Sequence, residues 1–388
     1  MQIKLKKNHS LNLGYQFVYN STSTDLLSQA SANFEEDNID DDDTLGGKGT
    51  SHTLYSEYLY DTKNTFLRFG LRNSLLSNSI EKFFFEPRMF SSIKLIKNLR
   101  LTSSFELKNQ QIVQLNTFES QINFSGEFLG LPNSDNFWVI SGTSDNELEE
   151  LQIIRSQQFT LGLLYSKKGW HFDVEGYYKS IKDTSFTRNI LALLATSSSD
   201  ELFINSKEKR WGVDFLLKKR VQNYRIWLGY TWSKTLVSLP VIQKRKFPNS
   251  FDQTHVLNIS QTLKIKKLEL SLGWNWATGR PFSILEDINL NDDDFFFSAI
   301  NKNGLNSERF KNYHRLDASA TYRFYFDAEK KVSSLIGLSL RNIYNRRNKI
   351  GQKFQFETDQ DNVEDVSIQN LSIESLRFTP DLVFRINF

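Results

Sequence analysis

Hydrophobic and polar side chains alternate along much of the chain, which is the pattern of a β-strand with one apolar and one polar face. Between residues 11 and 19 the odd positions carry Leu, Leu, Tyr, Phe and Tyr, whereas the even positions carry Asn, Gly, Gln and Val. The same alternation returns at 170–178, 211–218, 268–277 and 378–388. We therefore predict fourteen strands, near residues 10–19, 50–60, 64–75, 83–96, 98–108, 154–166, 168–180, 209–221, 222–235, 251–263, 265–277, 311–326, 332–345 and 376–388.

The connections between these strands alternate in length. Tight turns are expected at 61–63, 97, 167, 221–222, 264 and 327–331, whereas 20–49, 109–153, 181–208, 236–250, 278–310 and 346–375 are long. Outer-membrane β-barrels show this asymmetry, with short turns on the periplasmic side and long loops outside the cell. The pattern predicts that the long segments are extracellular and that the chain ends at the periplasm.

The two faces of the predicted strands differ in a way that separates a membrane barrel from a water-soluble sandwich. The polar face carries Gly, Asn, Asp, Glu and Arg, whereas the apolar face is aliphatic in the middle and aromatic at its ends. Aromatic residues at both ends of lipid-facing strands form the interfacial girdles of transmembrane barrels. The predicted girdle residues are Trp170, Tyr178, Trp211, Trp274, Trp276, Tyr322, Phe324, Phe326 and Phe388. The fold class favoured is an all-β, antiparallel transmembrane barrel, and a soluble sandwich is the alternative.

Composition supports the membrane barrel and removes several other classes. The chain has 388 residues with 48 basic and 45 acidic side chains, so nucleic acid is not an expected partner. It contains no Cys, which excludes disulfides, thiolate metal sites and Cys nucleophiles. No stretch approaches the roughly 18 apolar residues of a membrane helix. A mean hydropathy of −0.46 agrees with a barrel, because half of each strand faces a wet lumen.

The first residues continue the pattern as part of one more strand. Ile3 and Leu5 alternate with Lys4 and Lys6, as they would in a strand that descends into a tight turn at 7–9. The opening residues also lack the apolar segment of about 7–15 residues that a secretory signal contains. We therefore expect residues 1–388 to form a single unit that is the C-terminal part of a longer barrel, without a plug domain.

Six phrases, in this order along the chain, resemble the C-terminal barrel of TonB-dependent outer-membrane receptors. They are LPNSDNFWVISG (131–142), SQQFTLGLLYSKKGWHFDVEGYYKSIKD (156–183), KFPNSFDQTHVLNIS (246–260), LGWNWATGRPFS (272–283), NYHRLDASATYRF (312–324) and SLRNIYNRRN (339–348). The Asn- and Lys-rich style is similar to receptors of Bacteroidota. The closing LVFRINF looks like the strand that the barrel-assembly machinery reads.

The resemblance implies a 22-strand barrel, an N-terminal plug inside it and a motif that binds TonB. The fourteen strands would then be strands nine to twenty-two, and residues 1–6 would be the tail of strand eight. It also implies import of a scarce nutrient: a siderophore-bound iron, cobalamin, a glycan or a peptide. Implied partners are the missing plug and front portion of the barrel and the barrel-assembly machinery. Outer-membrane lipid is expected from the aromatic girdles, and the aromatic loop at 295–297 makes a surface lipoprotein a further candidate partner.

Charged side chains on the polar face are the candidate binding residues. By alternation, the lumen-facing charges of the last three strands are Arg315, Asp317, Arg323, Arg341, Asp381 and Arg385. Such charges need partners, so contacts within the wall or with a plug are favoured over substrate contacts. His255 and His314 fall in family-like phrases and are expected to be polar lumen residues.

Two loops and one glycine complete the candidate features. Asp40, Asp41, Asp42 and Asp43 are a weak calcium candidate, because they lack the Gly and distal Glu of an EF-hand, and a solvated acidic loop is favoured. Gly279 is expected to have a structural role where a strand leaves the membrane. No resident metal, no cofactor and no enzyme activity are predicted.

The residues leave three functions open. The first is the barrel segment of a nutrient receptor, the second is a self-contained passive pore of fourteen strands, and the third is a surface scaffold that binds partners through its long loops. An even strand number permits the pore. The substrate is not readable, because specificity lies in loops and in the plug.

Overall fold

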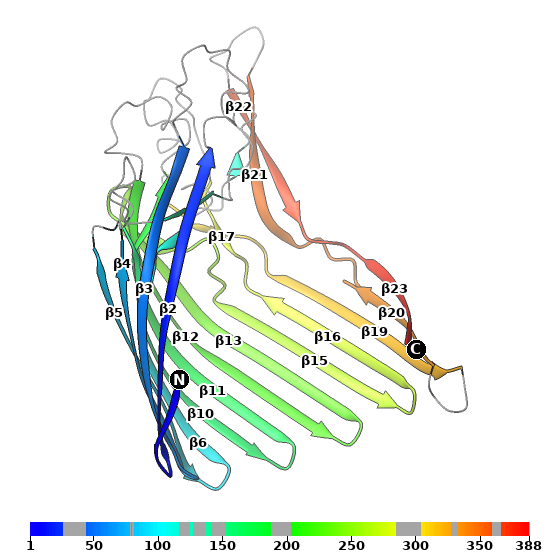
Figure 1. The fold of residues 1–388 in the computed structure, drawn as a ribbon. Helices are drawn as coiled ribbons and strands as arrows, with labels where there is room; N and C mark the ends of the chain where they lie inside the picture. The colour runs from blue at the N-terminus through cyan, green and yellow to red at the C-terminus, as the bar shows by residue number, and fades with distance from the viewer. Residues whose placement is uncertain are drawn as a thin grey trace.

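The computed structural model describes residues 1–25, 44–77, 79, 81–115, 125–126, 137–140, 152–187, 203–284, 304–326, 332–358 and 366–387. These residues form an antiparallel sheet of 16 strands that curves into an open trough (Figure 1). The strand order follows the chain from β1 (Gln2–Lys6) to β23 (Thr379–Asn387), so nearly every strand pairs with its neighbours in sequence. No helix within these ranges is long and apolar enough to cross a membrane.

The sheet contains all fourteen predicted long strands, which confirms the strand pattern. They are β2 (His9–Asp25), β3 (Thr44–Asp61), β4 (Thr65–Leu76), β5 (Phe83–Ile96), β6 (Leu99–Gln110), β10 (Ile154–Lys167), β11 (Trp170–Thr187), β12 (Phe203–Val221), β13 (Tyr224–Leu239), β15 (His255–Ile265), β16 (Leu268–Ala277), β19 (Tyr313–Tyr325), β20 (Ser333–Arg341) and β23. β1 pairs with β2, as expected for a partial strand at the front. Several strands run further than predicted, since β11 and β12 stay paired up to Thr187 and Phe203.

The short turns lie together at one end of the sheet, and the strand ends that lead into the long connections lie together at the other (Figure 1). We call these the short-turn end and the long-loop end. Tight hairpins need residues with positive φ, and the turns supply them at Asn98 (φ 82°), Lys168 (47°), Gly169 (78°), Gln222 (47°) and Lys266 (54°). A side chain on Gly169 would meet the backbone of Arg220, so glycine is required there.

Register assigns each side chain to one of two faces, because residues paired across strands share a face and successive residues alternate. Leu161, Val213 and Leu272 belong to the face that carries the large apolar side chains, which we call the hydrophobic face. The other face carries polar side chains, among them Glu175, Asp214 and Asn275, and we call it the polar face. Many side chains of the hydrophobic face are exposed, with Leu161 at 49% and Leu382 at 74%. These side chains therefore need lipid or another apolar environment to cover them.

Smaller elements gather at the long-loop end. β14 (Gln243–Pro248) folds back on β13, β17 (Pro281–Phe282) pairs with β18 (Glu308–Arg309), and β21 (Lys349–Thr358) pairs with β22 (Val366–Glu374). β8 (Ser125–Gly126) joins β21, and β7 (Ile112–Leu115) pairs with β9 (Phe137–Ile140). Val237, Leu239 and Phe247 are almost fully buried between β13 and β14 and form a small core there. The sequence pattern did not predict these elements.

Candidate functional site

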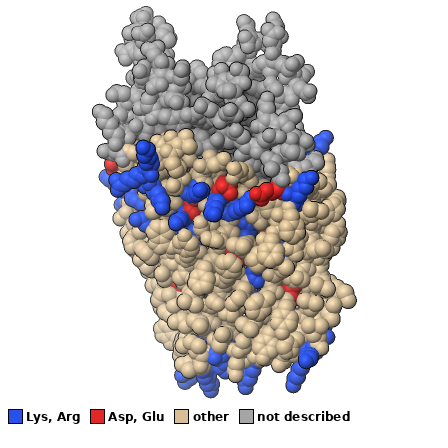
Figure 2. Space-filling model, turned by 90° about the vertical axis from the view of Figure 1, so that its left-hand side faces the viewer, with Lys and Arg blue, Asp and Glu red and all other residues tan. Residues whose placement is uncertain are grey.

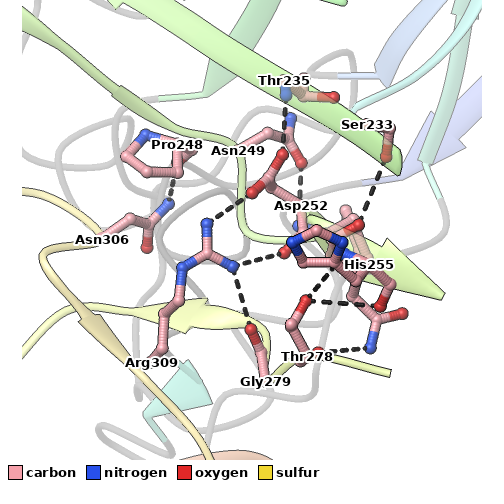
Figure 3. A network of polar contacts seen from close by, with 12 residues as sticks. Ser233, Thr235, Pro248, Asn249, Asp252, His255, Thr278, Gly279, Asn306 and Arg309 are labelled. Carbon is pink, nitrogen blue, oxygen red and sulfur yellow. Dashed lines mark hydrogen bonds and ion pairs between the residues drawn. The ribbon is translucent and has the colours of Figure 1, made fainter. Parts of the chain in front are cut away.

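An ion pair between the buried carboxylate of Asp252 and the partly exposed guanidinium of Arg309 joins two segments of the long-loop end that are far apart in sequence. Arg309 Nη2 donates to Asp252 Oδ2 (2.5 Å), and its Nη1 donates to the carbonyl oxygens of Asp252 (3.1 Å) and Gly279 (3.0 Å) (Figure 3). Only 1% of the Asp252 side chain is exposed. Its second oxygen accepts from the backbone N–H of Thr235 (2.7 Å). One carboxylate therefore holds β13, the 249–252 turn and β18 in fixed positions.

The turn before Asp252 is itself tied down by short-range and long-range bonds. Phe251 N donates to Asn249 Oδ1 (2.9 Å), and Asn249 N donates to Thr235 O (3.1 Å). Asn306 Nδ2 donates to Pro248 O (2.8 Å), so the segment before β18 packs on the same turn (Figure 3). The 248–252 turn thus cannot move independently of residues 304–309.

The connection after β16 passes very close to β18. Thr278 N donates to His255 O (2.9 Å), and Gln253 Nε2 donates to Thr278 O (3.0 Å), which fixes the end of the strand. Gly279 follows, and a Cβ atom on it would lie 1.7 Å from the carbonyl oxygen of Phe310. This close approach explains why glycine stands where β16 ends.

A cavity of about 310 Å³ opens beside this anchored region, between the ends of β15, β16 and β19. Four of its lining side chains are cationic: Arg280, Lys311, Arg315 and Lys349. Asn258, Asn275 and Gln253 add amide groups, and no Asp or Glu is among the described lining residues. The cavity is therefore suited to an anion that also accepts hydrogen bonds.

Aromatic rings hold two of the cavity's cations. The guanidinium carbon of Arg280 lies 5.4 Å from the ring centre of Phe251. Lys349 Nζ lies 5.2 Å from the ring of Phe310, which stacks on Phe282 at 4.5 Å. Contacts of this kind restrict long side chains. Arg315 is held by its own carboxylate, since its Nε donates to Asp317 Oδ2 (2.9 Å).

Register places the six predicted lumen charges on one face of the neighbouring strands β19, β20 and β23. Ser339 pairs with both Ser319 and Asp381, and Leu335 pairs with both Arg323 and Arg385. Two ion pairs form: Arg315 with Asp317 (2.9 Å) and Arg341 with Asp381 (3.4 Å). Within the described ranges Arg323 and Arg385 have no carboxylate partner. The structure brings only Arg315 to the cavity, and substrate or plug contact by the others stays a prediction.

The SLRNIYNRRN phrase forms a turn next to this wall in which Asn342 and Asn348 are buried. Asn342 is fully buried with φ of 51°, and its side chain accepts from Arg346 N (3.0 Å) and donates to Arg346 O (2.8 Å). Its backbone N–H donates to Asp317 Oδ1 (2.9 Å). Asn348 Oδ1 accepts from the backbone N–H of His314 (3.1 Å), and Asn348 Nδ2 donates to the carbonyl oxygen of His314 (3.0 Å). These Asn residues link the wall to the long-loop end.

The two histidines do not face the lumen, contrary to the expectation from the sequence. His255 pairs with Trp232, and His314 pairs with Trp276, so both lie on the hydrophobic face. His255 Nδ1 lies 2.8 Å from the hydroxyl of Tyr230, and His314 Nδ1 lies 3.3 Å from that of Tyr344. The expectation for them rested on the family-like phrases, and the alternation of β15 and β19 overrides it. They belong with the aromatic side chains, not with the cavity.

Seven of the predicted girdle aromatics lie on the hydrophobic face, and five of these seven lie near a strand end. Trp170, Tyr322 and Phe324 lie toward the short-turn end, where Lys219 Nζ sits 4.2 Å over the Trp170 ring. Tyr178 and Trp211 pair directly with each other in the middle of β11 and β12. Trp274 and Trp276 lie at the end of β16 that leads to the long-loop end, and Trp274 Nε1 donates to the hydroxyl oxygen of Tyr344 (3.0 Å). Phe326 follows β19 directly. Their membrane role stays a prediction.

Some predicted features lie outside the described residues, namely Phe388 and the calcium candidate Asp40, Asp41, Asp42 and Asp43. Conversely, sequence reasoning missed Asp252, Arg309 and Asn306 as the residues that organise the site. The phrase KFPNSFDQTHVLNIS contains Asp252, and its Pro-Asn-Ser run signals a turn. Nothing in that phrase identifies an arginine 57 residues later as its partner.

Comparisons with known proteins point in one direction. Residues 123–345 match the family described as TonB dependent receptor-like, beta-barrel. No curated protein sequence matches significantly. The fold is similar to that of the FrpB iron transporter from Neisseria meningitidis, with a TM-score of 0.60 and 12% identity over 99% of this chain and 53% of that one.

Two further solved structures show the same relationship. The siderophore receptor PirA from Acinetobacter baumannii matches with a TM-score of 0.56 and 13% identity, over 95% of this chain and 53% of that one. The ferric citrate transporter FecA in its unliganded form matches with a TM-score of 0.58 and 11% identity, over 99% of this chain and 52% of that one. The chain thus spans about half the length of these proteins, and at such low identity the likeness shows the fold alone.

Proposed function

The chain belongs to the TonB-dependent receptor-like β-barrel family, and on that premise we propose that it forms the C-terminal wall of an outer-membrane receptor that imports an anionic metal chelate. The complete receptor would have 22 strands and a plug inside the barrel. The long-loop end would face the outside of the cell, and the C-terminus the periplasm. The barrel wall and the substrate each rest on a separate observation.

Strand direction supports a wall that needs further strands to close. The path from β1 to β23 contains fifteen strands, and every neighbouring pair along it is antiparallel. With an odd number the first and last strands run in the same direction, so β1 and β23 cannot close the sheet as an antiparallel pair. Bacterial outer-membrane barrels have even strand numbers. Seven additional strands before β1 would give 22 and would let both edges pair antiparallel.

A cysteine pair tests this closure, because the chain has no native Cys. With Ile3→Cys on β1, we expect no intramolecular disulfide to Leu382→Cys, Phe384→Cys or Ile386→Cys on β23 in membranes. Ile3→Cys with Leu11→Cys is the positive control, since these residues are register partners on β1 and β2 and paired Cα atoms lie about 5 Å apart. High-yield crosslinking of β1 to β23 on non-reducing gels would establish a self-closed pore and contradict the proposal.

The cavity at the long-loop end supports an anionic ligand. Its four cations face an opening without a lining carboxylate, and rings or an ion pair hold three of them in place. A chelate such as ferric citrate offers several carboxylate oxygens at once, and charge-assisted bonds to them are about twice as strong as neutral ones. The proteins of similar fold include an iron transporter, a siderophore receptor and a ferric citrate transporter. The cationic cavity is the observation that carries the substrate proposal.

Equilibrium binding of ferric citrate tests this site, using the receptor that contains this chain in lipid nanodiscs. Arg280→Gln with Lys349→Gln is expected to weaken binding about 10- to 100-fold, because each lost charge-assisted bond is worth about 1.5 kcal/mol or slightly less beside water. Binding should also weaken as salt is raised from 50 to 300 mM.

The matched control removes two cations from the same face but away from the cavity. Arg323→Gln with Arg385→Gln should change the affinity less than twofold. Equal losses in both variants would show that only the general charge of the wall matters. Tighter binding of a neutral glycan or of cobalamin than of ferric citrate would replace the proposed substrate class.

A further inference from the structure

A groove crosses the hydrophobic face of the sheet where β15, β16, β19 and β20 lie side by side. It has a volume of about 430 Å³, and none of the residues that line it is charged. Ala318 and Ala320 on β19 lie between larger side chains of the neighbouring strands, which are Leu270, Leu272, Leu338 and Leu340. Figure 2 shows another side of the outside of the sheet, where Lys and Arg likewise gather toward the two ends of a broad band of other residues. The groove therefore belongs to the apolar band of the sheet.

Gln261 borders this groove and lies among aliphatic side chains. It pairs with Ile226 on β13 and with Leu272 on β16, so its side chain shares the hydrophobic face with theirs. Its Oε1 accepts from the hydroxyl of Tyr224 (3.0 Å). Within the described residues its Nε2 has no acceptor. An amide on an apolar surface costs free energy unless it is hydrogen-bonded, so this donor needs a partner.

The undescribed turn between β19 and β20 does not reach this amide. Leu272 pairs with Gln261 and with Ala318, which places Ala318 in the same row on β19. The turn begins at residue 327, about 30 Å beyond Ala318 along the strand. The Nε2 of Gln261 is therefore open to a group that approaches from the outside of the sheet.

The position of Gln261 along β15 favours a protein partner over lipid. β15 ends at Ile265, which pairs with Leu268, and Leu268 pairs with the girdle residue Tyr322. Gln261 lies four residues before Ile265, which is about 10 Å deeper in a membrane at the usual strand tilt. The apolar band of a barrel is about 25 Å tall, so the amide lies close to its middle. Acyl chains offer no hydrogen-bond acceptor at that depth, whereas a protein side chain does.

We propose that the groove and Gln261 form the contact surface of a dimer, in which a second copy of this chain packs on the first within the membrane. A two-fold axis along the membrane normal near Gln261 brings the two amides together, and each Nε2 donates to the second lone pair of the other Oε1. Such an axis makes one patch contact itself. Ile226 and Leu228, on the β13 side of the axis, then face the groove of the other copy. The membrane placement rests on the proposed function.

The area of this patch fits a weak dimer. The strands from β13 to β20 span about 19 Å, and about eight residues of each strand cross the apolar band. The patch is therefore about 500 Å² on each copy and about 1,000 Å² in total, the lower limit for a specific interface. Inside lipid the burial of apolar surface gives little driving force, and close packing and hydrogen bonds between chains hold proteins together. We therefore expect the amide pair and the small Ala residues to decide whether the dimer forms.

Crosslinking in membranes tests the dimer, because this chain has no native Cys. In a receptor whose remaining part is free of Cys, Leu263→Cys lies two residues from Gln261 on the same face and should give a covalent dimer with a short bismaleimide. Adding Gln261→Leu should lower the dimer yield about fivefold or more, because the amide pair is lost. Gln261→Asn keeps an amide and should lower the yield less than twofold. Ala318→Leu with Ala320→Leu fills the groove and should act like Gln261→Leu.

The matched control is Leu163→Cys on the hydrophobic face of β10. Leu163 lies four residues from the short-turn end of its strand, as Gln261 does on β15. This variant should give less than about a fifth of the dimer yield of Leu263→Cys, because no groove or amide is present there to hold two copies together. Equal yields at the two positions, or a yield that Gln261→Leu leaves unchanged, would overturn the proposal. A lipid or a different protein found in the groove, without a crosslink between copies, would also overturn it.

Two further readouts separate this proposal from the proposed function. In intact membranes Leu263→Cys and Leu163→Cys should both resist a charged, water-soluble maleimide. Rapid labelling of both would contradict the membrane wall itself, whereas protection without crosslinking would contradict only the dimer. Ferric citrate affinity should change less than twofold in Gln261→Leu, because the groove and the cationic cavity lie on opposite faces of the sheet.

Discussion

Replacing Asp252 with alanine is expected to release the long-loop end from the sheet. The change leaves the Arg309 guanidinium without its carboxylate and the Thr235 N–H without its acceptor. Removing one partner of a buried ion pair typically costs about 3–5 kcal/mol, and because 35% of the Arg309 side chain is exposed to water we expect the lower end of that range. Because the 248–252 turn and β18 both depend on this carboxylate, residues 304–310 should lose their fixed position. The cavity would lose its order, and ferric citrate affinity should fall at least tenfold.

Hydrogen exchange measures this loosening directly. The amides of Thr235 and of residues 304–310 should exchange about 10²- to 10³-fold faster in Asp252→Ala, since about 1.4 kcal/mol corresponds to a factor of ten. The exchange rates of Asp252→Asn should lie between those of the unmodified protein and of Asp252→Ala, because an amide oxygen can still accept from Thr235 N. The matched control is Asp381→Ala, which removes a half-exposed pair at 3.4 Å and should change little. Unchanged exchange in Asp252→Ala would show that the ion pair does not organise this region.

The long strands could be predicted because their signal is local. A strand in a membrane wall has lipid on one side and a polar lumen on the other, so every second residue reports its environment over ten or more positions. The same reasoning fails where both faces meet protein. β14 packs Phe247 against Val237, and β17 is two residues long, so neither has an alternating pattern to read.

The face of the sheet on which each side chain lies, and the residues that it contacts, could be predicted only in part. Arg315, Asp317 and Asp381 fall on the predicted face because their strands are regular. His255 and His314 do not, because they were assigned from the family-like phrases and not from alternation; His314 directly precedes Arg315, so the two side chains lie on opposite faces. Asp252 and Arg309 meet across 57 residues, and sequence spacing alone does not determine such contacts. The family-like phrases indicated where the site lies, but not which of their residues make it.

Gly279→Ala is the second change for which we expect a large effect. The added Cβ would lie 1.7 Å from Phe310 O and 2.4 Å from Phe310 C, and both atoms belong to backbone that cannot rotate away. Relief requires separation of the 279–282 segment from 308–310, which would lengthen the bonds from Phe310 N to Arg280 O (3.0 Å) and from Arg309 to Gly279 O (3.0 Å). Overpacking of this kind costs about 1–3 kcal/mol where side chains can adjust, and more against fixed backbone.

The expected result is a defect confined to the long-loop end. The rings of Phe251 and Phe310 position Arg280 and Lys349 at the cavity. Separation of the 279–282 segment from 308–310 should therefore displace these cations and weaken ferric citrate binding at least tenfold. Gly273→Ala is the matched control, because it lies in the neighbouring strand β16 and its Cβ would meet no atom within 4 Å. That variant should bind ferric citrate normally and retain the exchange rates of residues 304–310. If Gly279→Ala also binds normally, the close approach of the two segments is not what positions the cations, and the cavity must be organised through the Asp252 side of the network.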